Sequence, residues 1–201
     1  MPLPTSVKVH ERALCESDDV GEETRIWAFA HVMAGAKLGA RCNIGDHAFI
    51  ESGAVLGDDV TVKNGVAVWD HVTIGDLVFV GPGVTFTNEK RPRVEHHRAE
   101  GGYDAVATRI ESGATLGAAS IILCGVTIGR GALVGAGALV TRSVPAHALV
   151  VGSPAEFVRW VCGCGRDLDM DLACRCGRRY EPTPDDEGGG PSGLRLRTDV
   201  R

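Results

Sequence analysis

The sequence has few aromatic residues, no excess of positive charge and no long apolar run. Aromatic side chains make up 5% of its 201 residues, and the formal net charge is -5. General nucleic-acid binders are usually basic. Residues 1–12 lack the apolar core of a signal peptide, and no segment approaches the roughly 18 apolar residues that cross a bilayer. We therefore expect a cytoplasmic globular protein with neither nucleic acid nor membrane as partner.

The sequence is instead rich in glycine and small aliphatic residues, which recur with a period of six. Stepping by six from Leu14 reaches an aliphatic residue each time until Phe86, and the same phase resumes at Ile110 and runs to Val140. Glycine often follows the aliphatic residue, and the position four after it is small or β-branched. A period of six is a multiple of two, so each aliphatic residue falls on the same face of a strand. The pattern predicts a parallel β-solenoid with these residues inside.

The repeat also divides the chain into segments. We expect a lead-in at 1–13, a hexapeptide β-helix at 14–145 with an inserted loop at 88–109, a closing segment at 146–160, a cysteine-rich appendage at 161–180 and a flexible tail at 181–201. The loop interrupts the repeat without losing phase, so the chain should return to the same solenoid. Long loops in compact domains are often functional.

Three stretches carry a family resemblance. They read GEETRIWAFAHVMAGAKLGARCNIGDHAFIE (Gly21–Glu51), VKNGVAVWDHVTIGDLVFVGPGVTFTNEKRPR (Val62–Arg93) and GAGALVTRSVPAHALVVGSPA (Gly135–Ala155). They resemble the hexapeptide-repeat acyltransferases, in particular those that acetylate the 3-amino group of UDP-2-acetamido-3-amino-2,3-dideoxy-glucuronate. Enzymes acting on dTDP-3-amino-3,6-dideoxyhexoses carry similar blocks. The resemblance covers about residues 14–160.

The resemblance implies a left-handed β-helix of triangular cross-section, with roughly six coils of three hexads each. It further implies a homotrimer with active sites between subunits and acetyl-CoA as the acetyl donor. Acetyl-CoA would bind along the later coils, for which the matching residues are Gly117, Ala118, Gly135, Ala136 and Arg142. The chain departs from the family by Glu89 after Asn88, where aspartate is frequent, and by His71, where glycine is common.

Acetyl transfer to an amine requires a neutral amine, donors for the tetrahedral oxyanion and partners held in line. An amino sugar that titrates at about pH 8 has a useful neutral fraction without a strong base. Asn88 is the first candidate, because the family places this asparagine beside the acceptor amine and an amide oxygen can accept its hydrogen bond. The alternative is that Asn88 only turns the chain out of its strand. His71 is the candidate base, and its alternative is an inert turn residue.

Substrate binding calls for cations, because phosphates and an acidic sugar are anionic. Arg93, in the family's Pro-Arg pair, and Lys63 are the candidates, each also readable as a solvated surface charge. Asp70 and Glu89 flank the two candidate catalytic residues, and we expect both at the acceptor site. His31 lies in a family-like Trp-Ala-Phe-Ala-His run and is either a residue of the nucleotide site or a structural histidine.

Four of the seven cysteines form two C-x-C pairs, each followed by glycine (C-x-C-G), and nine residues separate the pairs. The four are Cys162, Cys164, Cys174 and Cys176. The glycine after each C-x-C pair lets backbone amides turn toward thiolates, as in zinc knuckles, although standard zinc ribbons use C-x-x-C. Structural zinc is the prediction, and reduced thiols or disulfides are the alternatives. Cys42 falls on the small inward position and is expected to pack in the core.

The favoured function is acetyl-CoA-dependent N-acetylation of a UDP- or dTDP-linked 3-amino sugar that feeds a polysaccharide or a glycosylated metabolite. An alternative is O-acetylation of serine or a simple sugar with His71 as base. The zinc hydratases of the same fold need three histidines around a metal, and the spacing of the histidines here does not match them. From a different class, the solenoid could be a scaffold without turnover, although a scaffold would not need the loop after Asn88.

Overall fold

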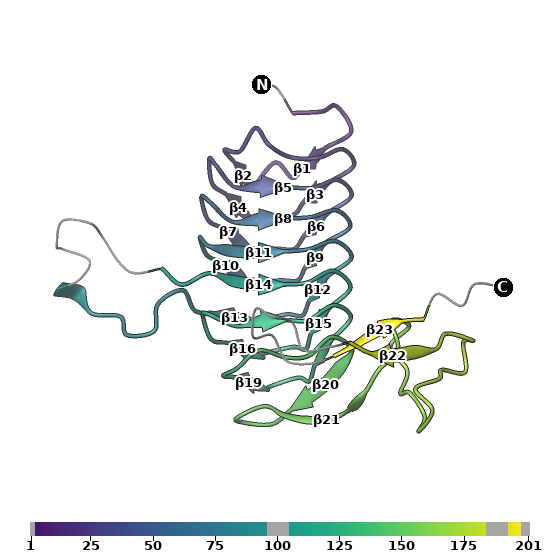
Figure 1. Cartoon of the computed structure of the whole chain (residues 1–201). Coiled ribbons are helices and arrows are strands. Elements are labelled where there is room, and N and C mark those ends of the chain that lie inside the picture. The colour runs from purple at the N-terminus through teal and green to yellow at the C-terminus, as the bar shows by residue number, and fades with distance from the viewer. Residues whose placement is uncertain (1–2, 96–104, 184–192, 198–201) are drawn as a thin grey trace.

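The protein is a β-solenoid in the computed structural model, which describes residues 3–95, 105–183 and 193–197. Figure 1 shows its coils stacked along one axis, a loop projecting from one side and a small C-terminal unit beside the base. One sheet holds seven parallel strands, one from each coil, and the solenoid therefore has about seven coils. The hexad count predicted roughly six coils. The difference arises partly because strand pairing begins at Lys8, before the first hexad.

Three sheets form the walls of the solenoid. The nine-stranded sheet comprises β1 (Lys8–Val9), β3 (Arg25–Ile26), β6 (Asn43–Ile44), β9 (Thr61–Val62), β12 (Phe79–Val80), β15 (Thr115–Leu116), β18 (Leu133–Val134), β20 (Ala148–Val151) and β21 (Glu156–Trp160). The seven-stranded sheet comprises β2 (Leu14–Cys15), β4 (His31–Val32), β7 (Phe49–Ile50), β10 (Ala67–Val68), β13 (Thr85–Phe86), β16 (Ile121–Ile122) and β19 (Leu139–Val140). The five-stranded sheet comprises β5 (Lys37–Leu38), β8 (Val55–Leu56), β11 (Val72–Ile74), β14 (Thr108–Ile110) and β17 (Thr127–Ile128). A separate antiparallel pair is formed by β22 (Tyr180–Pro182) and β23 (Leu194–Leu196).

The core confirms the period of six. Ile50 pairs with Val68, 18 residues later, so three hexads make one coil. The large aliphatic residues from Val20 to Val140 are buried, and so are the small residues that share the interior. Burying one such side chain contributes about 1.5–3 kcal/mol relative to leaving it exposed. Cys42 is buried as predicted, and this burial raises the pKa of its thiol.

The first aliphatic residue of the pattern is an exception. Leu14 is 52% exposed, and Leu14–Cys15 pairs with His31–Val32, which is 17 residues away and not 18. The first coil is therefore one residue short. Because side chains alternate along a strand, a shift of one residue turns Leu14 outward and Cys15 toward the core.

The glycines that follow the aliphatic residues allow the coils to stack closely. A Cβ at Gly39 would lie 2.4 Å from the carbonyl of Gly57, and one at Gly117 would lie 2.5 Å from the backbone nitrogen of Ala136. No side chain fits at those distances. These glycines therefore permit close contact between coils.

Three columns of turns join the sheets, and we name each after one residue. The Asn88 corner follows the seven-stranded sheet and includes residues 51–54, 69–71, 87–89, 123–126 and 141–143. The Gly117 corner follows the nine-stranded sheet and includes 45–48, 63–66, 81–84, 117–120 and 135–138. The Asp58 corner follows the five-stranded sheet and includes 39–42, 57–60 and 75–78.

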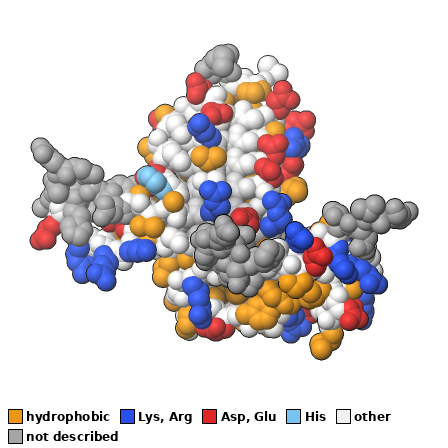
Figure 2. All heavy atoms as spheres, in the orientation of Figure 1, with side chains coloured by type: hydrophobic (Ala, Val, Ile, Leu, Met, Phe, Trp, Pro, Cys, Tyr) orange, Lys and Arg blue, Asp and Glu red, His pale blue; other side chains and the backbone are white. Residues whose placement is uncertain are grey.

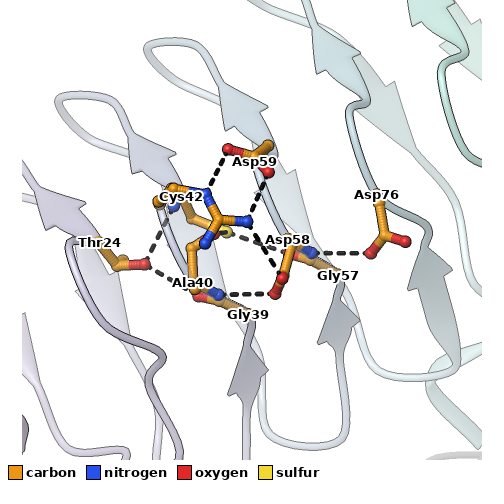
Figure 3. Close-up of polar contacts among 9 residues, drawn as sticks. Thr24, Gly39, Ala40, Cys42, Gly57, Asp58, Asp59 and Asp76 are labelled. Carbon is orange, nitrogen blue, oxygen red and sulfur yellow. Dashed lines mark hydrogen bonds and ion pairs between the residues drawn. The ribbon is translucent and has the colours of Figure 1, made fainter.

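At the Asp58 corner, carboxylates cap the turns of the preceding coils (Figure 3). Asp58 accepts a hydrogen bond from the backbone N–H of Ala40 at 2.9 Å, and Asp76 accepts one from Asp58 at 2.9 Å. Arg41 donates to Asp58 and Asp59 across the same surface. These bonds satisfy backbone donors that the turns leave outside the sheets.

The inserted loop leaves the solenoid after β13, and the chain returns to it at β14 (Figure 1). Strand β14 pairs with β11 on one side and with β17 on the other. The predicted return in phase is therefore confirmed. Residues 96–104 of this loop, with His96 and His97, lie outside the described residues.

The base of the solenoid is closed by the antiparallel pair β20–β21. Hydrophobic side chains gather near the base (Figure 2), where Val151, Phe157 and Val158 are exposed. The backbone N–H of Leu194 donates to the carbonyl of Ala146 at 3.1 Å, so β23 returns to the last turn of the solenoid.

Residues 184–192 and 198–201 of the expected flexible tail lie outside the described residues. Within the described chain, no helix has the length and apolarity to span a membrane.

Candidate active site

The Asn88 corner contains a cleft of about 570 Å³, a size that suits a small-molecule ligand. Its lining residues include Trp69, Asn88, Glu89, Lys90, Cys124 and Thr141. They come from the ends of β10, β13, β16 and β19, four neighbouring strands of one sheet. The indole N–H of Trp69 donates to the carbonyl of Phe86 at 2.8 Å and thereby fixes the ring at the cleft.

Asp70 joins the two candidate catalytic residues. Its Oδ1 accepts a hydrogen bond from the side-chain amide of Asn88 at 3.1 Å, and its Oδ2 lies 3.0 Å from Nδ1 of His71. The backbone N–H of Asp70 donates to Glu51 at 2.9 Å. Three candidate residues of the sequence analysis thus lie together at one corner, with the carboxylate of Asp70 between the other two.

This contact decides which way the amide of Asn88 points. An ionised carboxylate only accepts hydrogen bonds, so the NH₂ group of Asn88 must face Asp70. The amide oxygen consequently lies on the other side of the planar group, where it can accept a further hydrogen bond. Asn88 is half-buried and lines the cleft, so an amine bound there has an acceptor available.

His71 lies at a turn position that favours glycine. Its φ is 59°, in the left-handed region, and Gly53, one coil earlier at the equivalent position, has φ 88°. The left-handed conformation costs an L-residue about 1–2 kcal/mol. This explains why glycine is common where this chain has His71. The imidazole is 54% exposed, so it faces solvent as well as Asp70.

An aromatic series runs from the cleft toward the N-terminus along the seven-stranded sheet. Trp69 contacts Phe49 with ring centroids 5.8 Å apart, and Phe49 contacts His31 at 5.4 Å. His31 Nε2 lies 2.9 Å from a carboxylate oxygen of Glu16. His31 therefore has a structural partner two coils away from Trp69.

The candidate cations lie in different places. Arg93 is exposed beyond the cleft, where its guanidinium donates to the carbonyl of Pro92 at 3.1 Å. Arg142 belongs to the Asn88 corner and forms an exposed ion pair with Glu156 at 2.6 Å. Lys63 belongs to the Gly117 corner, across the seven-stranded sheet from Asn88.

The other predicted acetyl-CoA residues also lie at the Gly117 corner. Gly117 and Ala118 follow β15, and Gly135 and Ala136 follow β18. Their turns stack so closely that Gly117 has no space for a side chain. Within one chain, therefore, Asn88, Asp70, His71 and Glu89 occupy one corner, while four of the five predicted acetyl-CoA residues occupy another.

Four further residues of this corner were not predicted from the sequence: Glu51, Trp69, Cys124 and Thr141. The signal that could have found them is the coil period, which places Asp70 and Asn88, 18 residues apart, at one corner of successive coils. Glu51 and Trp69 have the same spacing. The same period continues past the loop, because Cys124 follows Asn88 by 36 residues and Thr141 follows Trp69 by 72.

The four cysteines of the C-x-C-G motifs lie together outside the cleft. All four sulfur atoms are within 4.8 Å of one another, and none of the four is in a disulfide. A second cleft, of about 690 Å³, lies on this appendage between residues 165 and 175 and contains none of the predicted substrate residues.

Comparisons with known proteins agree with this description. The profile of the bacterial transferase hexapeptide family (six repeats) matches residues 19–52, 53–88 and 107–142. A dTDP-3-amino-3,6-dideoxy-alpha-D-galactopyranose 3-N-acetyltransferase of Aneurinibacillus thermoaerophilus is 44% identical over 176 residues, which are 86% of this chain and 90% of that protein. A protein of Staphylococcus aureus strain COL, named for acetyl transfer, is 42% identical over 74 residues, 37% of each chain. A crystal structure of the BC4754 gene product of Bacillus cereus shares the fold, with a TM-score of 0.53, 21% identity and 78% of each chain covered.

Proposed function

This chain belongs to the bacterial transferase hexapeptide family, and from that premise we propose that it transfers the acetyl group of acetyl-CoA to the amino group of a nucleotide-linked 3-amino sugar. The Aneurinibacillus relative, similar over 90% of its own length, acts on a dTDP-linked 3-amino-dideoxygalactose, and we take that sugar class as the acceptor. The observation that carries the proposal is the side-chain amide of Asn88, which lines the cleft and whose nitrogen is bonded to Asp70, so that its oxygen is left to accept from an amine.

The reaction needs no strong base. The neutral sugar amine attacks the thioester carbonyl, the C–S bond breaks, and the departing thiolate, with a pKa of about 8.5, can take the proton that the amine loses. Asn88 accepts a hydrogen bond from the amine and aims its lone pair. Glu89 and Arg93 lie at or just beyond the cleft, where we propose that they bind the sugar. We assign Lys63 to phosphate binding and His31 to the rim of the nucleotide site.

We also propose that the active site forms between subunits of a trimer, with the left-handed coiling that the resemblance implies. The acceptor candidates and most acetyl-CoA candidates lie on opposite sides of the seven-stranded sheet. The outward residues of that sheet are Leu14, His31, Phe49, Ala67, Thr85, Ile121 and Leu139. Those of the five-stranded sheet are Lys37, Val55, Thr73, Arg109 and Thr127, which are more polar. A second copy packed on the more apolar sheet would bring its Gly117 corner toward Asn88.

A matched pair of substitutions tests this interface. Ile121→Glu places a charge on the seven-stranded sheet, and Val55→Glu places one on the five-stranded sheet at a site of similar exposure, 39% and 37%. Analytical ultracentrifugation should show a trimer for Val55→Glu and a loss of trimer, together with activity, for Ile121→Glu. A monomeric, active parent protein would contradict the proposal.

The cysteine-rich appendage takes no part in acetyl transfer in this proposal. It lies after the solenoid, whereas the cleft is lined by residues between 69 and 141. Zinc held by four thiolates has no open coordination position for a substrate. We therefore propose a structural zinc knuckle.

Mass spectrometry of the acetylated product tests the activity, because it avoids thiol reagents that the cysteines of this chain would consume. The acceptors are UDP- and dTDP-linked 3-amino sugars, with serine and free glucosamine as controls. Acetylation of one nucleotide-linked 3-amino sugar, with serine and the free sugar unchanged, is the expected result. No transfer to any acceptor would favour the scaffold alternative.

A second candidate function is O-acetylation with His71 as base. The contact of 3.0 Å between His71 and Asp70 favours it, since a carboxylate orients an imidazole and stabilises its protonated form. Acetylation of serine or of a sugar hydroxyl in the same assay would establish this alternative.

A further inference from the structure

The two C-x-C-G motifs form two equivalent hairpin turns. In the first, the N–H of Cys162 donates to the carbonyl of Arg166 and the N–H of Gly165 donates to Cys162, both at 2.8 Å. In the second, twelve residues later, Cys174 donates to Arg178 at 2.8 Å and Gly177 to Cys174 at 2.9 Å. Gly165 and Gly177 both have positive φ, at 83° and 90°. The chain therefore forms the same turn twice, and the two turns face each other so that their four thiols lie together.

The sulfur atoms have the spacing of a tetrahedral metal site. Cys162 and Cys176 are 3.6 Å apart at Sγ, and so are Cys164 and Cys174. With Zn–S bonds of about 2.3 Å, the edge of a regular tetrahedron is about 3.8 Å. A disulfide needs about 2.05 Å between its sulfur atoms. The C-x-C spacing therefore does not prevent the four thiols from binding one metal ion, because the two hairpins bring all four together.

Tyr180 supports the cluster from outside. Its hydroxyl oxygen accepts a hydrogen bond from the N–H of Gly163 at 2.9 Å and lies 3.2 Å from Sγ of Cys162. Because the hydroxyl oxygen already accepts from Gly163, its proton is available to the sulfur of Cys162. Outer partners of this kind orient metal ligands and adjust their basicity.

The same tyrosine connects the cluster to the solenoid. Its ring packs on His147, with centroids 4.6 Å apart. His147 also bonds to Val161, the neighbour of Cys162, through two hydrogen bonds. The N–H of Val161 donates to the backbone carbonyl of His147 at 2.7 Å, and Nδ1 of His147 donates to the carbonyl of Val161 at 3.1 Å. Beyond the appendage, β23 is also fastened to the solenoid, where the N–H of Leu194 donates to the carbonyl of Ala146, next to His147.

We propose that Cys162, Cys164, Cys174 and Cys176 bind one zinc ion, that Tyr180 donates to the Cys162 thiolate, and that the ion fastens the C-terminal chain to the last coil of the solenoid. The zinc site is independent of the proposed acetyl transfer. A unit of about 20 residues has too small a core to be stable alone, so removal of the metal should unfold the appendage. Four thiolates select a soft metal such as zinc, and iron–sulfur chemistry is the competing use of such ligands.

The test begins with the full chain, purified without chelator under reducing conditions. Elemental analysis should find one zinc per chain and no iron. The double variant Cys164→Ser/Cys176→Ser, which removes two exposed ligands, should lose the zinc. The control Cys15→Ser, a half-buried cysteine of the first coil, should retain it. X-ray absorption should show four sulfur ligands at about 2.3 Å.

Tyr180→Phe separates the supporting role from the packing role, because it keeps the ring on His147 and removes only the hydroxyl. Zinc should remain bound, with an affinity in chelator competition lower by about 10–100-fold. Chelation of the parent protein should lower its Tm, and added zinc should restore it. Iron in place of zinc, an intact mass showing disulfides in the reduced preparation, or four freely reactive thiols with a Tm insensitive to zinc would each overturn the proposal.

Discussion

Removing Asp70 should impair acetyl transfer through Asn88. The carboxylate accepts from the amide nitrogen of Asn88 at 3.1 Å and is itself only 19% exposed, so it fixes which face of the amide meets the substrate. Asn88→Ala removes the group that accepts a hydrogen bond from the amine. Asp70→Ala leaves that group in place but allows the side-chain amide of Asn88 to flip. The two substitutions should therefore affect one interaction.

The expected magnitudes follow from the hydrogen bonds. A bond to a charged group contributes about 1.5–3 kcal/mol, enough to hold more than nine in ten Asn88 amides in one orientation. Without Asp70, an amide free to flip presents its oxygen about half the time and also gains rotamers, so we expect kcat/KM to fall about fivefold, or about 1 kcal/mol. Asn88→Ala should lower kcat/KM by more than about tenfold, which corresponds to about 1.4 kcal/mol.

The assay is a double-mutant cycle on kcat/KM, in which mass spectrometry detects acetylation of the nucleotide-linked amino sugar. The double variant should be no slower than Asn88→Ala alone, giving a coupling of about 1 kcal/mol. Asp76→Ala, which removes a carboxylate that caps a turn at the Asp58 corner, is the control and should leave kcat/KM unchanged. An unchanged kcat/KM for Asp70→Ala, or losses that add in the double variant, would show that Asp70 does not act through Asn88.

Three further predictions concern single residues. His71→Gly should raise Tm by a few degrees, because a φ of 59° costs an L-residue about 1–2 kcal/mol and the substitution loses only an exposed pair with Asp70. A fall in kcat of about 100-fold or more would instead identify His71 as the base. Gly39→Ala should lower Tm by several degrees, because its Cβ would lie 2.4 Å from the backbone of Gly57, and thermal unfolding that matches the parent would contradict the close stacking of the coils. Burial lowers the pKa of His147 below 6.5, so the unfolded chain takes up a proton on this histidine before the folded chain does, and stability should decrease as the pH falls below about 6.5. His147→Asn should weaken this dependence in thermal melts at pH 5 and 7. An unchanged dependence would show that His147 is not its source.

The sequence alone was sufficient for the interior of the solenoid. A period of six keeps each large aliphatic residue on one side of a strand, and from Val20 to Val140 those residues are buried. Local pattern decides this because burial depends on alternation along each strand and not on distant contacts. The pattern failed at Leu14, since a coil one residue short is visible only in the pairing of β2 with β4.

The resemblance and residue chemistry selected Asn88, His71, Asp70 and the four cysteines, but not the contacts among them. The orientation of the Asn88 amide depends on Asp70 one coil earlier, and the grouping of Cys162 with Cys176 depends on two hairpins that face each other. Residue types identify possible donors and acceptors, and their separation in space follows from the closure of the coils and turns. The sequence thus determined the repeat, the core and the candidate groups. The tertiary structure decided which of those groups meet, because contacts 18 residues apart arise only once the coils stack, and the contact between Cys162 and Cys176 arises only once the two hairpins fold.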